Sequence, residues 1–369
     1  MSRAAGVAAL RLPIAALVAC AAALAAGAPA RLGPAKVQAV ERAIEAEKSR
    51  LHIPGLSVAV GEDLQLAWSR GFGLSDLEDN AAATPETLFR IASISKPVTA
   101  VAVMQLVERG KLDLDAPIQR YVPSFPEKPW PLTLRHLLSH LGGIRHYQSF
   151  AEVYSTRHYA DLTEALQIFS ADPLLSEPGA AFHYSTYGYV LLGAAVEAAS
   201  GLPFAEYLKR NIFAPAHMTA TSVDDVFAVL PHRARGYRRT TNGDIANCGL
   251  FDASNKVPGG GLVSTPEDLV RFVIALEKGD LVSAATRTLM FTRARTSAGE
   301  QVPYGLGWSV FERNGGLWVA HSGAQPGAST FLLAKPAGDV MVVVLANLEG
   351  VDLGPLAGRL ADLVAPGAH

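Results

Sequence analysis

A serine and a lysine three positions apart are the first residues of this chain that could do chemistry together. Of the nine lysines, only Lys96 follows a serine at this spacing, and that serine is Ser93. An i, i+3 pair at the start of a helix lies on one face. A lysine held close and partly desolvated can take the hydroxyl proton and so activate a weak nucleophile. The pair indicates covalent catalysis if other elements support it, because a two-residue pattern often occurs by chance.

The residues after Ser93 predict a helix that would position this pair. Pro97 is tolerated in a first turn, and apolar residues recur at helical spacing over 98–107 before Gly110. Ser93 would then lie at the helix N-terminus, where free backbone N–H groups favour developing negative charge.

Tyr184 is the second candidate. It follows a Pro-Gly turn and precedes an apolar helical pattern over 187–200. A phenol near a lysine ammonium can have a lowered pKa and relay protons. The same letters, Tyr-Ser-Thr, recur at 154–156, but there the neighbours are polar and no apolar helix follows. Context favours Tyr184, although most tyrosines only pack and form one hydrogen bond.

The third candidate is the segment His321-Ser322-Gly323-Ala324, at the end of a strand-like run. A glycine here lets an edge strand approach a ligand closely. The backbone N–H of Ala324, with that of Ser93, could bind an oxyanion. Removing one such donor typically raises the activation free energy by about 2.7–4 kcal/mol. Taken alone, His321 is explained more simply as a strand-end histidine with a satisfied hydrogen bond.

These three elements, in this order, resemble the motifs of the serine beta-lactamase and penicillin-binding-protein superfamily. The strongest resemblance is to its class C-like branch of beta-lactamase-related esterases, D-amino-acid peptidases and mitochondrial serine beta-lactamase-like proteins. It spans about residues 51–348 and includes three further stretches, at 134–144, 259–272 and 304–308.

The resemblance implies a role for each motif. Ser93 would be the acylated nucleophile, and Lys96 and Tyr184 the proton-transfer pair. The segment 321–324 would line the substrate pocket, with the N–H of Ala324 in the oxyanion hole. The implied activity is that of a serine hydrolase acting through an acyl-enzyme, with no cofactor and no metal.

Two positions depart from the family pattern. Thr186 is expected to contact the substrate, but it stands where asparagine is common, so an amide that could hold the substrate is lost. His321 stands where lactamases usually carry lysine, so a fixed cation for a substrate carboxylate is missing. Amide, peptide or ester hydrolysis is therefore expected, more than efficient beta-lactam hydrolysis. The alternative is a non-catalytic module that recognises cell-wall peptides or a protein partner.

Composition excludes several other functions. The 369 residues are 49% hydrophobic with a net charge of −2, so a large core is expected and nucleic acid is not an expected partner.

A zinc site is also not expected. His136 and His140 are four apart, but the glutamate of a zinc-protease helix is absent between them. The expected partner is a small-molecule or peptide substrate, and the oligomeric state stays open.

Residues 1–30 are typical of a secretory signal peptide, with Arg3 and Arg11 before an apolar run and an Ala-x-Ala site. Export to a secreted or periplasmic location is expected, with no stable membrane span after cleavage. Two alternatives stay open: a lipoprotein acylated at Cys20, and a mitochondrial presequence. Without residues 1–30 only Cys248 remains, which leaves no intramolecular disulfide.

The remaining pattern predicts one hydrolase domain over 31–369. Strand-like runs near both ends, with helices between them, favour an α/β (α+β) fold of the beta-lactamase/transpeptidase type. Its mixed, mainly antiparallel sheet would be flanked by helices, with a helical insertion at about 111–216. Thr265 is predicted to cap a helix, with Pro266 at its first position and Asp268 completing the cap. The expected strands are 56–60, 64–68, 305–311, 317–321, 329–333 and 340–346, and the expected helices include 35–51, 133–141, 187–200 and 353–363.

Overall fold

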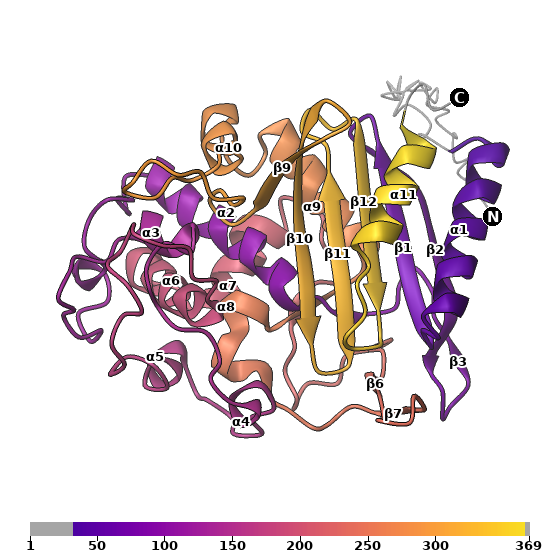
Figure 1. Cartoon of the computed structure of the whole chain (residues 1–369), viewed down its shortest axis with the longest axis horizontal. Helices are drawn as coiled ribbons and strands as arrows, with labels where there is room; N and C mark the ends of the chain where they lie inside the picture. Colours follow the sequence, from indigo (N-terminus) through magenta and orange to yellow (C-terminus); the bar gives the residue numbers. More distant parts are fainter. Residues whose placement is uncertain (1–31, 366–369) are drawn as a thin grey trace, which may run out of the picture.

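A seven-stranded antiparallel sheet, built from both ends of the chain, forms the centre of the molecule (Figure 1). The computed structural model describes residues 32–365, so the predicted signal peptide and Cys20 lie outside the described residues. The sheet has the order β3-β2-β1-β12-β11-β10-β9. Its strands are β1 (Gly55–Glu62), β2 (Gln65–Asp76), β3 (Ala81–Ala82), β9 (Ser309–Arg313), β10 (Gly316–Gln325), β11 (Ala328–Ala334) and β12 (Val340–Ala346).

The pairing of β1 with β12 joins the two ends of the chain, with Val58 opposite Val344. Asn347 closes this junction, because its side chain accepts a hydrogen bond from the N–H of Gly55 at 2.8 Å and donates to the carbonyl of Leu74 at 3.0 Å. The predicted fold class, an antiparallel sheet from both termini flanked by helices, is confirmed.

Both faces of the sheet are covered, which explains why β12 is apolar along its whole length. Successive side chains of a strand point to opposite faces. Val342 and Val344 therefore join one hydrophobic cluster, and Val343 and Leu345 join the other. The first cluster includes α1 (Pro34–Arg50) and α11 (Gly354–Val364), and the second includes α2 (Ser95–Glu108) and α9 (Pro266–Lys278).

A helical region lies beyond α2, on the side away from α1 and α11 (Figure 1). Within it, α2 packs against α6 and α8, and all three are largely buried. Among residues 32–365, no single helix has the length and apolar character to cross a bilayer, although α6 and the segment Phe204–Phe213 pass that test as a bent pair. The helices here are η2 (Ile118–Arg120), α3 (Leu134–Leu138), α4 (Phe150–Val153), α5 (Leu162–Leu166), α6 (Thr186–Ser200), α7 (Phe204–Leu208) and η3 (Lys209–Phe213).

Short elements connect the sheet to the helices. They form a three-stranded sheet in the order β4-β8-β5 and a separate hairpin of β6 and β7. These elements are β4 (Phe89–Arg90), η1 (Ala92–Ile94), β5 (Ser222–Val223), β6 (Tyr237–Arg239), β7 (Ile245–Asn247), η4 (Ala253–Lys256), α8 (Val257–Gly260), β8 (Leu262–Ser264) and α10 (Ala284–Met290).

Two local predictions need correction. The strand expected over 305–311 begins only at Ser309, because Gly307 has a φ of +89°, a value that ends extended structure. In the N-terminal cap of α9, the predicted role of Thr265 is confirmed and that of Asp268 is wrong. Thr265 accepts a hydrogen bond from the N–H of Asp268 at 3.2 Å. The Asp268 carboxylate instead accepts from the N–H of Ala220 at 2.9 Å, since that loop packs on the helix start.

Replacing the hydroxyl of Thr265 tests how much this cap stabilises the fold. Thr265→Val keeps the side-chain shape but leaves the buried N–H of Asp268 without its partner. We expect the free energy of unfolding to fall by about 1 kcal/mol. Urea denaturation measures the change, with Thr265→Ser, which keeps the hydroxyl, as the control. Equal stabilities for the valine and serine variants would contradict the assigned cap.

Candidate active site

Ser93 lies in η1, the single turn that leads into α2. The residue before it, Ala92, has a φ of +48°, which is uncommon for a residue with a side chain. Strand β10 presses against this turn at Gly323, where an added Cβ would overlap Thr330 Oγ1 and the carbonyl of Ile91. Thr330 also donates a hydrogen bond to that carbonyl at 3.0 Å. The sheet therefore holds the turn that carries Ser93, and only a glycine fits at the contact.

Lys96 is completely buried and lies next to Ser93. Its Nζ is 3.0 Å from Ser93 Oγ, 3.1 Å from Thr186 Oγ1 and 2.7 Å from the carbonyl of Gly259. These partners come from η1, the start of α6, and α8. Burial lowers the pKa of Lys96 well below its usual value, and the positive charge of Lys256 lowers it further. The site therefore favours the neutral amine, which is the form that can accept a proton.

Tyr184 joins this pair. Lys96 Nζ lies 4.7 Å from the centre of its ring, and the Ser93 hydroxyl is near enough to influence the pKa of the phenol. The three residues predicted to be catalytic are thus adjacent in the structure. The lowered pKa expected for the phenol is wrong, because burial raises the pKa of Tyr184 more than the neighbouring Ser93 hydroxyl lowers it. A protonated phenol is consequently the stable form beside Ser93.

His140, one of the two histidines with metal-ligand spacing in the sequence, supports the tyrosine segment instead, and His146 does the same. Nδ1 of His140 accepts from the N–H of Ser185 at 3.1 Å, and Nδ1 of His146 accepts from the N–H of Thr186 at 3.3 Å. Burial lowers both pKa values, that of His146 to about 4. Among residues 32–365, no group of three or more histidine, cysteine or acidic side chains could hold a metal ion.

The predicted substrate-binding residues are only partly brought together. Thr186 and Ala324 line a cavity beside Ser93, whereas His321, Ser322 and Gly323 do not. The buried His321 donates through Nδ1 to the carbonyl of Ser322 at 2.7 Å, and its Nε2 lies 2.8 Å from the hydroxyl of Tyr304. Burial and the charge of Lys96 lower the pKa of His321 to about 3. At neutral pH this histidine is uncharged and offers no cation to a substrate.

The cavity beside Ser93 is small, about 40 Å³, and it contains residues that the sequence did not point to. Lys256 and Tyr147 belong to no motif, and Gln325 lies one position beyond the segment that was singled out. No local pattern could have identified them, because they are 54 or more positions from Ser93 and meet it only through folding. The lining comprises Ala92, Ser93, His146, Tyr147, Val153, Thr186, Lys256, Gly259, Gly260, Ala324 and Gln325.

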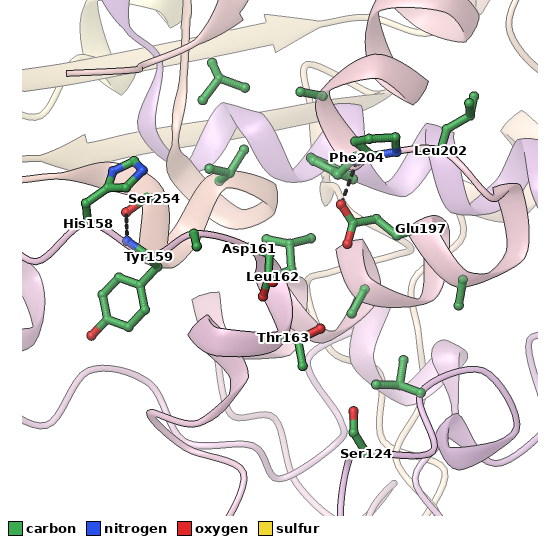
Figure 2. Close-up of a pocket in the computed structure, with 18 of the residues that line it drawn as sticks. Ser124, His158, Tyr159, Asp161, Leu162, Thr163, Glu197, Leu202, Phe204 and Ser254 are labelled. Atoms are coloured by element: carbon green, nitrogen blue, oxygen red, sulfur yellow. Dashed lines mark hydrogen bonds between the residues drawn. The ribbon is translucent and has the colours of Figure 1, made fainter. Parts of the chain in front are cut away.

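A larger pocket of about 960 Å³ lies on the other side of η4, and none of the three predicted catalytic residues lines it. Figure 2 shows Glu197 in its wall, where the carboxylate accepts a hydrogen bond from the N–H of Phe204 at 2.7 Å. On the opposite wall, Ser254 accepts from the N–H of Tyr159 at 2.9 Å. The segment η4 borders both spaces, since Ser254 faces the larger pocket and Lys256 the smaller cavity.

Comparisons with known proteins agree with this arrangement. The family model described as Beta-lactamase matches residues 40–365. The mitochondrial serine beta-lactamase-like protein LACTB of Homo sapiens is 30% identical, over 87% of this chain and 79% of the relative. Penicillin-binding protein 4* of Bacillus subtilis is also 30% identical, over 79% of this chain and 68% of the relative.

A solved structure gives the same result for the fold. The penicillin-binding protein homologue from Pyrococcus abyssi superposes with a TM-score of 0.76 at 27% identity, covering 87% of this chain and 75% of the other. The resemblance read from the sequence motifs is thereby confirmed: this chain belongs to the beta-lactamase family, whose members include penicillin-binding proteins and serine beta-lactamase-like proteins.

Proposed function

We propose that this protein is a serine hydrolase that cleaves an amide, peptide or ester bond through a covalent acyl-enzyme on Ser93. The observation that carries the proposal is the distance of 3.0 Å between Lys96 Nζ and Ser93 Oγ, together with the complete burial of Lys96. A desolvated lysine beside a serine hydroxyl is a general base placed for nucleophile activation. Family membership supports the same reaction class.

The hydrogen bonds around Lys96 give its lone pair a direction. A neutral amine has two N–H bonds, and the oxygens of Gly259 and Thr186 accept both of them. The lone pair is then left for the hydroxyl proton of Ser93. Thr186 serves here as an acceptor for the base, a role that differs from the substrate contact expected at its position.

The reaction then proceeds in two halves. Ser93 Oγ attacks the carbonyl carbon as its proton passes to Lys96, and backbone N–H groups of Ser93 and Ala324 stabilise the oxyanion. The bond to the leaving group breaks, and Tyr184, which burial keeps protonated, donates the proton that the leaving group needs. Lys96 returns its proton to Tyr184. Water next attacks the acyl carbon, and the same two groups take its proton and restore Ser93.

The substrate class follows from what the strand segment lacks. His321 is neutral and outside the cavity, so strand β10 offers no cation at this position to the carboxylate of a beta-lactam. Esters, amides or peptides are therefore preferred over beta-lactams. The relatives named above include a mitochondrial protein and a penicillin-binding protein, which is compatible with the exported or organellar location predicted from residues 1–30.

Labelling tests the nucleophile. A fluorophosphonate should add one adduct to the wild-type protein by intact mass, and none to Ser93→Ala. Turnover of p-nitrophenyl acetate should fall by about a thousandfold or more in this variant. Ser200→Ala, at the end of α6, serves as the matched control and should label like the wild type. An equal adduct on Ser93→Ala would remove Ser93 as the nucleophile and favour the non-catalytic alternative.

The pH profile tests the base. Because the neutral amine is the active form, kcat/KM for an uncharged ester should fall as pH drops through the lowered pKa of Lys96 and protonates it. His146 and His321 have pKa values of about 4 and about 3, so they stay uncharged near neutral pH. They therefore do not contribute to the fall in kcat/KM in that pH range. Lys96→Arg should lose activity at every pH, since guanidinium stays protonated. Activity of Lys96→Arg within tenfold of the wild type would contradict the assignment.

Removing one phenol tests the proton donor. Tyr184→Phe should lower kcat by about 10²–10⁴-fold, the usual contribution of a positioned acid or base. The control is Tyr154→Phe in the repeated Tyr-Ser-Thr sequence, whose hydroxyl donates to the carboxylate of Glu349 and not to Ser93. Steady-state rates on an ester with a poor leaving group give the clearest difference. Similar losses in both variants would mean that Tyr184 has no special role.

A further inference from the structure

A second lysine, Lys256, lies in the wall of the Ser93 cavity with only 2% of its surface exposed. Its Nζ donates to the carbonyl of Val153 at 3.0 Å and lies 5.2 Å and 4.9 Å from the ring centres of Tyr147 and Phe251. Burial lowers the pKa of Lys256 to about 8, so the ammonium form still predominates at neutral pH. In the proposed mechanism this charge only helps to lower the pKa of Lys96, and it contacts no reacting group.

Within the part of the chain that the structure describes, the charge of Lys256 has no direct counter-ion. The two carboxylates that act on it electrostatically are those of Asp224 and Asp252. Asp224 pairs with Arg90 at 2.8 Å and with Arg233 at 3.1 Å, and Asp252 contacts His158 at 2.9 Å.

None of the ion pairs formed within residues 32–365 includes Lys256. A buried charge without a partner is costly, and proteins normally satisfy it with an ion pair or a ligand. An anion that enters the cavity would supply the missing partner.

Gln325 provides a second, independent donor in the same cavity. Its Nε2 is buried, and within the described part of the chain it has no hydrogen-bond partner. The cavity lining includes no acidic side chain. A cation and an unsatisfied amide N–H beside one small space match the two oxygens of a carboxylate.

We infer that Lys256 and Gln325 form an anion site that binds a carboxylate on the acyl part of the substrate. The inference rests on the proposed function, since it deepens the substrate choice of the same site. Tyr184, the donor to the leaving group, does not line this cavity, so the leaving group lies on the Tyr184 side and the acyl chain enters here. A volume of about 40 Å³ limits that chain to a short one. Half-esters or half-amides of short dicarboxylic acids fit this description.

Ligand binding tests the site without any turnover. Glutarate should bind to Ser93→Ala in isothermal titration, and glutaramide, its uncharged analogue, should bind at least about tenfold more weakly. Adding Lys256→Met should weaken glutarate binding by a similar factor, and Gln325→Leu gives a second variant at a partly exposed position. Lys335→Met, which removes an equal charge at a surface ion pair, is the control. Equal affinity for glutarate and glutaramide, or no loss in either cavity variant, would overturn the inference.

Kinetics separates this inference from the proposed function. The ratio of kcat/KM for monoethyl glutarate to that for ethyl valerate should fall at least about tenfold in Lys256→Met and not in Lys335→Met. If Lys256 only lowers the pKa of Lys96, both esters change alike and the ratio stays constant, which overturns the anion site. Glutarate binding without turnover of any ester would refute the hydrolase and keep the site. Ester turnover without glutarate binding would do the reverse.

Discussion

The burial of one amine is the constraint on which the rest of this structure depends. Lys96 reaches Ser93 only because α2, α6 and α8 pack tightly enough to exclude water from around its side chain. Desolvation of an ammonium is expensive, and the chain offsets it with oxygen atoms from Thr186 and Gly259. The same burial lowers the pKa of the amine and so favours the neutral form that can accept the serine proton, which means that the cost to stability is also the source of reactivity.

The sheet supplies the second half of this arrangement. Strands from both ends of the chain pair through β1 and β12, and the resulting sheet presents β10 to the turn that carries Ser93. The unusual backbone at Ala92 persists because Thr330 and the close approach at Gly323 hold its neighbours in place. The nucleophile is therefore held between the sheet and a buried helix.

Electrostatics at the site come mainly from lysines. His140, His146 and His321 are all held uncharged by burial, so among the residues that line the cavity the positive charge belongs to Lys256. That charge opposes protonation of Lys96 and at the same time attracts anions. One side chain can thus influence both the base and the substrate, and the two effects are separable because only the second depends on the charge of the ligand.

The sequence by itself determined much of the fold and of the reacting groups. The apolar run over 340–346 predicted a strand, and the Ser-x-x-Lys spacing, followed by an apolar helix, predicted a nucleophile beside an amine. These features are local, because the spacing of apolar residues that indicates a strand or a helix can be seen within a short stretch of sequence.

Tertiary structure alone decided the charges and the shape of the cavity. The raised pKa of Tyr184, the sequestered His321 and the position of Lys256 all arise from desolvation and contacts among segments far apart in the chain. A pKa reports the surroundings of a group in three dimensions, and for that reason no reading of neighbouring residues could have supplied it.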